Sequence, residues 1–330
     1  MKARRAYVTG AAGLIGKDVV RQLRSADWEV TAADVVAAPA QLQQQGVTWC
    51  VERAEDLSAQ RLAGYDAVIH LGALTLSAEQ KSFGAQVDLP DARPMLSVNV
   101  LGTENVFRSS CAAKVPCVVY ASTAAVYGRP LFHTHLGDHA VEATGPFRPT
   151  SLYAHSKLMC EGMADFYAEQ STTRFIGLRP TFSYGLGRLS GISGMFAAWI
   201  AQAIRGERAV LGHPFGLGGK LQLIYVKDMA QNFVDAAISG ASGSNAAAAI
   251  RSSVFNSATH QVLSMAQIRD VVRACTDNSD VHVADGDFVP QLQMPLMSTR
   301  DAFEQLGCTQ RYPLDKAIAD MKQELARNAH

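Results

Sequence analysis

The chain has 330 residues, of which 48% are hydrophobic and 18% are charged, a composition typical of a folded protein with a sizeable core. Lysines and arginines equal aspartates and glutamates in number, so the formal net charge at pH 7 is zero. This balance argues against the basic surface of nucleic-acid-binding and membrane-surface proteins, and we expect neither a nucleic acid nor a membrane as partner.

Membrane insertion and secretion are not expected either. No apolar run reaches the roughly 18 residues of a transmembrane helix, and Met1 to Thr9 lacks the apolar core of a signal peptide. The cysteines form no Cys-x-x-Cys pair and mostly lie in apolar runs, which is typical of a reducing compartment, so we expect the protein in the cytoplasm. These cysteines are Cys50, Cys111, Cys117, Cys160, Cys275 and Cys308.

The first half of the chain alternates short apolar runs with amphipathic stretches. A strand is predicted at residues 6–8, followed by a glycine turn and a helix from Leu14 whose apolar side chains share one face. Further strands are predicted at residues 29–33, 47–51, 67–71, 118–121 and 175–178, with helices at 98–111 and 153–167. Continuous apolar strands separated by helices predict an α/β fold with a doubly wound parallel sheet.

The regular alternation ends after Arg179. Glycine-rich loops are expected at residues 185–194 and 212–220, and a low-complexity surface loop at 240–249. Towards the end, a short helix is predicted at residues 299–306, stopped by Gly307, and a last helix is predicted from Pro313.

The first turn of this sheet carries glycines in the sequence Thr-Gly-Ala-Ala-Gly-Leu-Ile-Gly, from Thr9 to Gly16. Gly10, Gly13 and Gly16 let the backbone turn tightly and approach a pyrophosphate, while the helix N-terminus offers free N–H groups. The spacing is not the commoner Gly-x-Gly-x-x-Gly, so taken alone this segment is also compatible with a purely structural turn.

An acidic residue follows at the expected distance. Asp34 ends the second predicted strand, 18 residues after Gly16, close to the roughly 20 residues expected for the carboxylate that binds an adenosine ribose. A carboxylate repels a 2′-phosphate, and no Arg or Lys lies between Asp34 and Glu52. The sequence therefore favours NAD over NADP as cofactor.

A tyrosine and a lysine lie four residues apart in the helix predicted at 153–167. This spacing places Tyr153 and Lys157 on one helical face. A nearby cation can lower the pKa of a tyrosine, so the pair can supply a base at neutral pH. On spacing alone, an amphipathic helix with an incidental lysine remains an alternative.

Eight motifs occur in one order along nearly the whole chain. They are Thr9-Gly10-x-x-Gly13-x-x-Gly16, Asp56-Leu57, His70-Leu71-Gly72-Ala73, Asn99-Val100-x-Gly102-Thr103, Ser122-Thr123-x-x-Val126-Tyr127-Gly128, Tyr153-x-x-x-Lys157, Arg179-Pro180 and Tyr225-Val226-x-Asp228. Together they resemble the extended short-chain dehydrogenase/reductase family, the NAD-dependent epimerase/dehydratase group. The resemblance implies a Rossmann fold, NAD as cofactor and an enzymatic activity.

The resemblance also implies roles for individual residues. Thr123 is similar to the hydroxyl that bonds the reacting oxygen, and Tyr153 to the general acid/base. Lys157 would hold the nicotinamide ribose and lower the pKa of Tyr153, while Asn99 would support the active-site hydrogen bonds. The implied cofactor-binding residues are Gly10, Gly13, Leu14, Ile15, Gly16, Asp34, Asp56, Leu57, Leu71, Gly72, Ala73, Asn99, Tyr153, Lys157 and Pro180. The implied substrate-facing residues are Thr75, Thr123, Ala124 and Thr181.

Departures from the family pattern bear on the substrate. Sugar dehydratases carry an Asp-Glu pair where this chain has Ala124 and Ala125, so a dehydratase is not expected. Nucleotide-sugar enzymes usually place an Asn after Arg-Pro and cations near the diphosphate, whereas this chain has Thr181 and Leu221. Each lost charge-assisted bond is worth about 1.5–3 kcal/mol, although Lys220 and Arg188 could compensate in part.

We therefore expect an NAD-dependent oxidoreductase that transfers a hydride between nicotinamide and a hydroxyl-bearing carbon of a small polar substrate, such as a sugar, sugar acid or hydroxy acid. A nucleotide-sugar epimerase with the same Thr/Tyr/Lys site is the first alternative, and a non-catalytic NAD-binding scaffold the second. The predicted domains are an NAD-binding Rossmann domain at residues 1–178 and 220–258, and a smaller, discontinuous substrate-binding domain at 179–219 and 259–330.

Two further expectations concern metals and assembly. His133, His135 and His139 crowd one loop, but their spacing matches no metal-ligand pattern, so no metal is expected. The helices at 98–111 and 153–167 usually form a dimer interface in the family that the chain resembles, so we expect a homodimer.

Overall fold

The computed structural model describes residues 3–43, 46–75, 91–129, 140–188, 191–242, 251–286 and 295–328. These residues form a seven-stranded sheet in the order β10-β6-β5-β4-β1-β2-β3, and every neighbouring pair is parallel. The strands are β1 (Arg5–Thr9), β2 (Glu29–Asp34), β3 (Thr48–Val51), β4 (Ala67–His70), β5 (Cys117–Ala121), β6 (Arg174–Pro180) and β10 (Ser252–Ser257).

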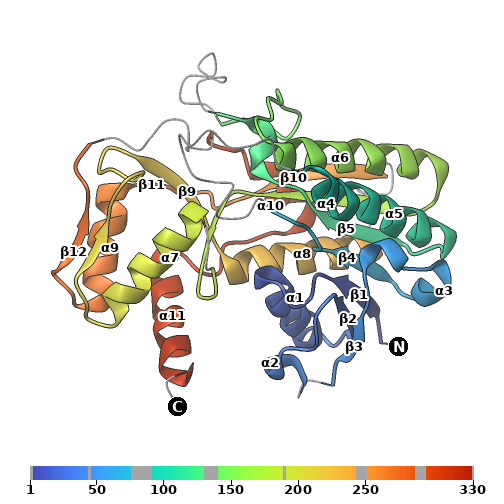
Figure 1. Ribbon diagram of the computed structural model, residues 1–330, viewed down its shortest axis with the longest axis horizontal. Helices are drawn as coiled ribbons and strands as arrows, with labels where there is room; N and C mark the ends of the chain where they lie inside the picture. Colours follow the sequence, from blue (N-terminus) through green and yellow to red (C-terminus); the bar gives the residue numbers. More distant parts are fainter. Residues whose placement is uncertain are drawn as a thin grey trace.

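Both faces of this sheet are apolar and covered, as the continuous apolar strands predict. Successive residues of a strand point to opposite faces, so Val8 belongs to one core and Tyr7 to the other, and β5 divides Val119 and Val118 in the same way. Figure 1 shows α5 (Gly102–Ala112) and α6 (Leu152–Gln170) on one side of the sheet, with α1 (Leu14–Ser25) and α8 (Val226–Ala241) on the other.

Shorter elements complete the sheet region. They are α2 (Ala40–Gln43), the 3₁₀ turn η1 (Ala54–Asp56), α3 (Ala59–Leu62), α4 (Arg93–Leu96), the π-helical turn η3 (Ser97–Leu101) and the 3₁₀ turn η4 (Ala124–Tyr127). Because α4, η3 and α5 follow one another directly, the helix predicted at 98–111 contains a π-helical segment at its start.

A second, smaller part lies beside the carboxyl ends of the strands (Figure 1). It contains a three-stranded sheet, in which β9 (Lys220–Tyr225) pairs with β7 (Phe182–Tyr184) and β11 (Val262–Ser264), and a parallel pair of β8 (Ala209–Leu211) and β12 (Val281–Val283). Helix α10 (Arg300–Leu306) lies against β10 and α8 of the large sheet, whereas the helices of the smaller part are α7 (Gly191–Ile204), α9 (Met265–Thr276) and α11 (Leu314–Asn328). These elements come from two stretches of the chain, as a discontinuous domain requires.

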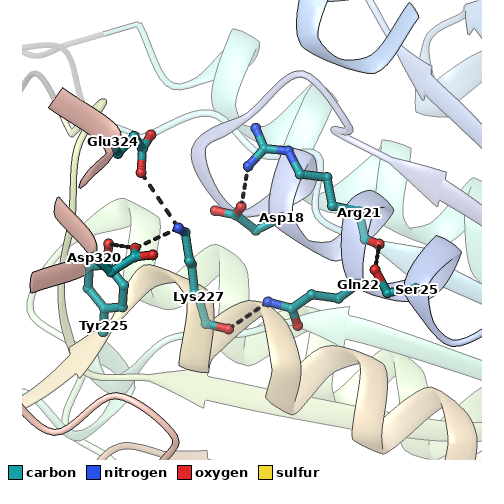
Figure 2. Close-up of polar contacts among 8 residues, drawn as sticks. All are labelled: Asp18, Arg21, Gln22, Ser25, Tyr225, Lys227, Asp320 and Glu324. Atoms are coloured by element: carbon teal, nitrogen blue, oxygen red, sulfur yellow. Dashed lines mark hydrogen bonds and ion pairs between the residues drawn. The ribbon is translucent and has the colours of Figure 1, made fainter. Parts of the chain in front are cut away.

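Polar contacts connect the two parts on the side of the sheet covered by α1 and α8 (Figure 2). Lys227, in the first turn of α8, accepts a hydrogen bond on its carbonyl from Gln22 of α1 at 2.9 Å. Its Nζ donates to Asp320 of α11 at 2.5 Å and lies 3.7 Å from Glu324. The hydroxyl of Tyr225 also donates to Asp320, at 2.6 Å. The C-terminal helix is thus fixed to the helix that starts at the glycine turn.

The predicted strands and helices of the first half are confirmed, with ends that differ by at most three residues when η3 is counted with α5. Two loop predictions were wrong in part. The loop expected at 185–194 gives way to α7 at Gly191, because apolar side chains such as Phe196 and Trp199 are buried in the core. The loop expected at 240–249 begins two residues late, since α8 continues to Ala241, and residues 243–250 lie outside the described part.

Two general features follow from the described residues. All six cysteines are free thiols. None of the helices in the described part is long and apolar enough to cross a membrane. The domain boundaries drawn from the sequence stay a prediction; β10 completes the large sheet, while β9 pairs within the smaller one.

Candidate active site

The glycine turn lies where the direction of the sheet's connections reverses, between β1 and β4. Open α/β sheets bind ligands in the crevice at this point. Gly10 has φ +67°, and a Cβ there would stand 2.6 Å from the backbone nitrogen of Gly72. A Cβ on Gly16 would stand 2.2 Å from the carbonyl oxygen of Gly10. Both positions therefore require glycine to keep the turn closed tightly against β4.

Free donors face outwards from this turn. Helix α1 begins after Gly13, which provides no side-chain cap, and its first turn contains no acidic residue. Its first N–H groups are therefore available to an anion. Asp34 lies beside the turn because its carboxylate accepts hydrogen bonds from the backbone of Ala12 at 2.9 Å and Val35 at 2.8 Å. A tight turn, an uncapped helix start and a fixed carboxylate suit the pyrophosphate and ribose of a dinucleotide.

The reactive side chains come from the end of β5 and the first turns of α6. Thr123 follows β5 in an extended conformation and its hydroxyl oxygen accepts a hydrogen bond from the N–H of Ala125 at 3.2 Å. Ser151 caps α6 by accepting from Ala154, also at 3.2 Å. The helix then presents Tyr153 and Lys157 one turn apart, with Lys157 only 2% exposed.

The electrostatics differ from the sequence-based expectation for Tyr153. Burial raises the pKa of Tyr153; the positive charge of Arg188 and a hydrogen bond from Thr123 oppose this rise. Burial also lowers the pKa of Lys157, against the nearby charges of Cys160 and Glu161. The expectation that Lys157 lowers the pKa of Tyr153 is thus wrong for the protein alone, because burial dominates and Arg188 is the cation that acts on the phenol.

Asn99 fixes the segment that borders the site after β4. Its side-chain oxygen accepts from the backbone N–H of Leu74 at 2.7 Å, and its amide donates to the carbonyl of Leu74 at 2.9 Å and to the hydroxyl of Ser156 at 3.2 Å. Asn99 is fully buried within the π-helical turn η3. Widened turns of this kind often occur at functional sites. Here the turn places one amide between the β4 loop and α6.

His70 connects the glycine turn to the same region. Its Nδ1 lies 2.7 Å from the hydroxyl of Thr9, and its Nε2 lies 3.0 Å from the hydroxyl of Thr103. Thr103 donates its own proton to the carbonyl of Asn99 at 2.6 Å, so it can only accept from His70. The arrangement therefore assigns the ring proton of a neutral His70 to Nε2 and lets Thr9 donate to Nδ1.

A buried ion pair supports the residue before Thr123. Arg179 donates to both carboxylate oxygens of Glu161, at 2.8 and 2.7 Å, and the hydroxyl of Ser122 donates to the same carboxylate. Arg179 also donates to the hydroxyl of Tyr127 at 2.7 Å. Because Glu161 lies one turn after Lys157 on α6, this pair fixes the end of β5 against the helix that carries Tyr153.

These elements enclose a cleft of about 470 Å³. Most of the predicted site residues line it: Gly10, Gly13, Leu14, Ile15, Gly16, Leu71, Ala73, Thr75, Thr123, Tyr153, Lys157, Pro180 and Thr181. The structure does not place the remaining ones in its lining: Asp34, Asp56, Leu57, Gly72, Asn99 and Ala124. Ala124 is fully buried and packs in a separate apolar cluster with Val126 and Tyr127, so its side chain does not reach the substrate space.

The cleft also contains residues that were not among the predicted site residues. Ser122, Ser151, Ser183, Arg188 and Met229 contribute to the lining. Ser122 belongs to the motif that contains Thr123, and Ser151 lies two residues before Tyr153, so the sequence alone could have indicated both. The three histidines at 133, 135 and 139 lie outside the described residues. Within the described part, no group of three or more His, Cys, Asp or Glu side chains could hold a metal ion.

Comparison with known proteins agrees with this geometry. The family model for the NAD dependent epimerase/dehydratase family matches residues 6–247. The chain is 31% identical over 188 residues to L-arabinose 1-dehydrogenase (NAD(P)(+)) of Haloferax volcanii, covering 53% of this chain and 65% of that protein. It is 28% identical over 176 residues to uronate dehydrogenase of Pseudomonas syringae pv. tomato, covering 53% and 58%. The chain thus covers less than two-thirds of either relative.

A solved structure extends the similarity to the whole fold. MoeE5 in complex with UDP-glucose and NAD superposes with a TM-score of 0.76 at 23% identity, covering 99% of this chain and 100% of that one. The Rossmann fold expected from the sequence is confirmed by this similarity, and NAD as cofactor is confirmed by the family model. With the family model matching well over half of its length, the chain belongs to the NAD dependent epimerase/dehydratase family.

Proposed function

We propose that this protein is an NAD-dependent dehydrogenase of a small polar substrate, a sugar, sugar acid or hydroxy acid. The observation that carries the proposal is that Thr123, Tyr153 and Lys157 line the same cleft as the glycine turn. NAD, when bound, supplies the hydride acceptor. A scaffold protein has no need of a buried lysine one helical turn from a tyrosine that bonds a threonine.

The side chains divide the proton chemistry between them. The oxygen of Thr123 already accepts from Ala125, so its own proton is free to bond a substrate oxygen or the phenol of Tyr153. Once its own proton has been released to solvent, Tyr153 takes the hydroxyl proton of the substrate as the phenolate, while the carbon-bound hydrogen leaves with its electron pair and the hydroxyl becomes a carbonyl. Lys157 is held by burial at the foot of the cleft, where its ammonium can bond a ribose hydroxyl.

A free substrate rather than a nucleotide sugar is favoured by the position of Leu221. The nucleotide-sugar pattern usually has a cation there, but this leucine is 5% exposed and belongs to the apolar core. The side chain at this position therefore offers no positive charge to a diphosphate. The relatives named for arabinose and uronate fit the same conclusion.

The test is a substrate panel combined with Tyr153→Phe. NADH formation is followed with aldoses, uronates, aldonates and hydroxy acids, beside UDP- and dTDP-sugars. We expect NADH from a free sugar or acid, and a loss of kcat of roughly 10²–10⁴-fold in Tyr153→Phe with unchanged NAD binding. Tyr167→Phe, on the same helix but bonded to Glu104 at 2.5 Å, serves as the matched control with normal kcat.

Two results would contradict the proposal. Conversion of nucleotide sugars alone, without net NADH, would make the protein an epimerase using the same residues. NAD binding without turnover of any compound would favour the scaffold.

We also propose that the protein is a homodimer that works in the cytoplasm. Leu101 beside α5, and Met159 and Phe166 on α6, are 61%, 52% and 59% exposed. Met159 and Phe166 are seven residues apart, so they share one helical face. A second copy would cover these apolar side chains, as in the helix-paired dimers that the sequence resemblance implies. The free thiols suit a reducing compartment.

A further inference from the structure

The charge of the cleft is uneven. Its described lining contains two cations, Lys157 and Arg188, many hydroxyl groups, and no carboxylate. The charge of Lys157 is opposed by the nearby Glu161. Arg188 forms no ion pair with any described residue; Tyr153 is the titratable group that acts on it. A cleft of this composition attracts an anion to the end where Arg188 lies.

The guanidinium of Arg188 is also incompletely bonded. Its Nε is buried and has no hydrogen-bond partner among the described residues. Burial lowers the pKa of Arg188, with Tyr153 opposing. Buried donors in folded proteins are almost always paired. Arg188 lines the cleft and its Nε has no partner; a planar guanidinium in this position suits a carboxylate, which it can bind through two parallel hydrogen bonds.

Arg188 follows a turn that passes near the cofactor's usual anion site, but its charge acts on Tyr153. It follows β7 and the turn Gly185–Gly187, in which Gly187 has φ +85°. The same turn passes near the start of α1, since a Cβ on Gly187 would stand 3.4 Å from Leu14. The uncapped N-terminus of α1 already offers donors for a pyrophosphate. The charge of Arg188 instead acts on Tyr153, where the reacting carbon must lie.

We propose that Arg188 binds a carboxylate of the substrate beside Tyr153, so that the enzyme selects sugar acids or hydroxy acids over neutral sugars. This inference rests on the proposed function and narrows it to acidic substrates. Arg188 is then a specificity-determining residue that touches the substrate. Because the diphosphate contacts usual in nucleotide-sugar enzymes are missing, Arg188 is the one cation of the described lining, besides Lys157 at the ribose, that can pair with a single small anion.

The experiment compares acidic and neutral substrates that would occupy the same site. Arg188→Gln and Arg188→Lys are assayed with uronates and aldonates, each against the neutral aldose of the same configuration. Arg205→Gln is the matched control, because Arg205 pairs with Glu207 at the exposed end of α7. Thermal stabilisation by the same compounds, in the presence of NAD, measures binding independently of turnover.

We expect the unmodified protein to prefer the acid. Arg188→Gln should raise the KM for the acid by about 10- to 150-fold, the value of a charge-assisted bond, and abolish stabilisation by the acid. The KM for neutral aldoses and the affinity for NAD should change by less than about threefold. The KM of Arg188→Lys for the acid should lie between those of the natural protein and Arg188→Gln, since lysine keeps the charge but not the paired donors.

Three outcomes would overturn the inference. The first is that the natural protein uses the acid and the aldose equally well, and that Arg188→Gln uses them equally well too. The second is weakened NAD affinity with an unaltered KM for the acid, which would assign Arg188 to the pyrophosphate and leave the proposed dehydrogenase intact. The third is that no acid stabilises the protein. Arg188-dependent stabilisation by an acid that is never oxidised would instead support the inference and refute the proposed function.

Discussion

His70 provides a quantitative test of the buried hydrogen bonds beside the site. The ring is 2% exposed and both nitrogens are paired. Burial, followed by the charge of Lys157, lowers the pKa of His70 to about 3. An unfolded chain has a histidine pKa of about 6.5. Folded and unfolded states therefore bind different numbers of protons between these two values.

The sign and size of the effect follow from this difference. Below about pH 6.5 the unfolded chain takes up a proton that folded His70 refuses, so stability falls as the pH falls towards about 3. Above about pH 6.5 both states are neutral and the contribution is complete. Between about pH 7 and about pH 5 the loss amounts to about 2 kcal/mol in the free energy of unfolding.

The assay is urea unfolding of the natural protein and of His70→Gln at these two pH values. His70→Gln removes the titrating ring, so its stability should fall by about 2 kcal/mol less than that of the natural protein over the same interval. His282→Gln is the control, because His282 is half-exposed on β12 beside Asp280. The same pH dependence in the natural protein and His70→Gln would refute the assignment of a neutral, buried ring.

Two further predictions concern the buried ion pair and the exposed helix face. Glu161→Gln leaves the guanidinium of Arg179 buried opposite a neutral amide, which should lower the free energy of unfolding in urea by about 3–5 kcal/mol. The control is Glu169→Gln, at an exposed position of the same helix, which should leave the free energy of unfolding almost unchanged. A loss below about 1 kcal/mol for Glu161→Gln would contradict the role of the pair. Phe166→Glu should convert the dimer to a folded monomer, as measured by light scattering. Val210→Glu, at a similarly exposed position on β8, should leave the dimer intact. A natural protein that is already monomeric would exclude the interface.

Features that depend on short stretches of chain could be predicted from the sequence. The parallel sheet and its helices follow from apolar runs and helical spacing, and the glycine turn follows from Gly10, Gly13 and Gly16. The proximity of Tyr153 and Lys157 needs only the pitch of a helix. Each of these sequence patterns is local, so the structure it predicts does not depend on the rest of the fold.

Features that depend on contacts between distant segments could not. The partners of His70 come from two other elements, and nothing in the motif around it indicates a neutral ring. The effect of Lys157 on Tyr153 was misjudged because spacing gives distance but not burial, and burial sets the direction of both pKa shifts. Arg188 follows a loop of no regular pattern, so its place beside Tyr153 emerges only when β7 is positioned.

The edge strand of the large sheet has a consequence for the synthesis of the chain. Strand β10 pairs with β6, from Ser252–Phe175 to Ser257–Pro180, although about 70 residues separate them. At the usual 5–20 residues per second, a ribosome takes roughly 4–14 s to cover that interval. During this time the nascent chain presents the unpaired backbone of β6, a template for unwanted strand addition. Chaperones that shield nascent chains should therefore matter most while the segment between β6 and β10 is being translated.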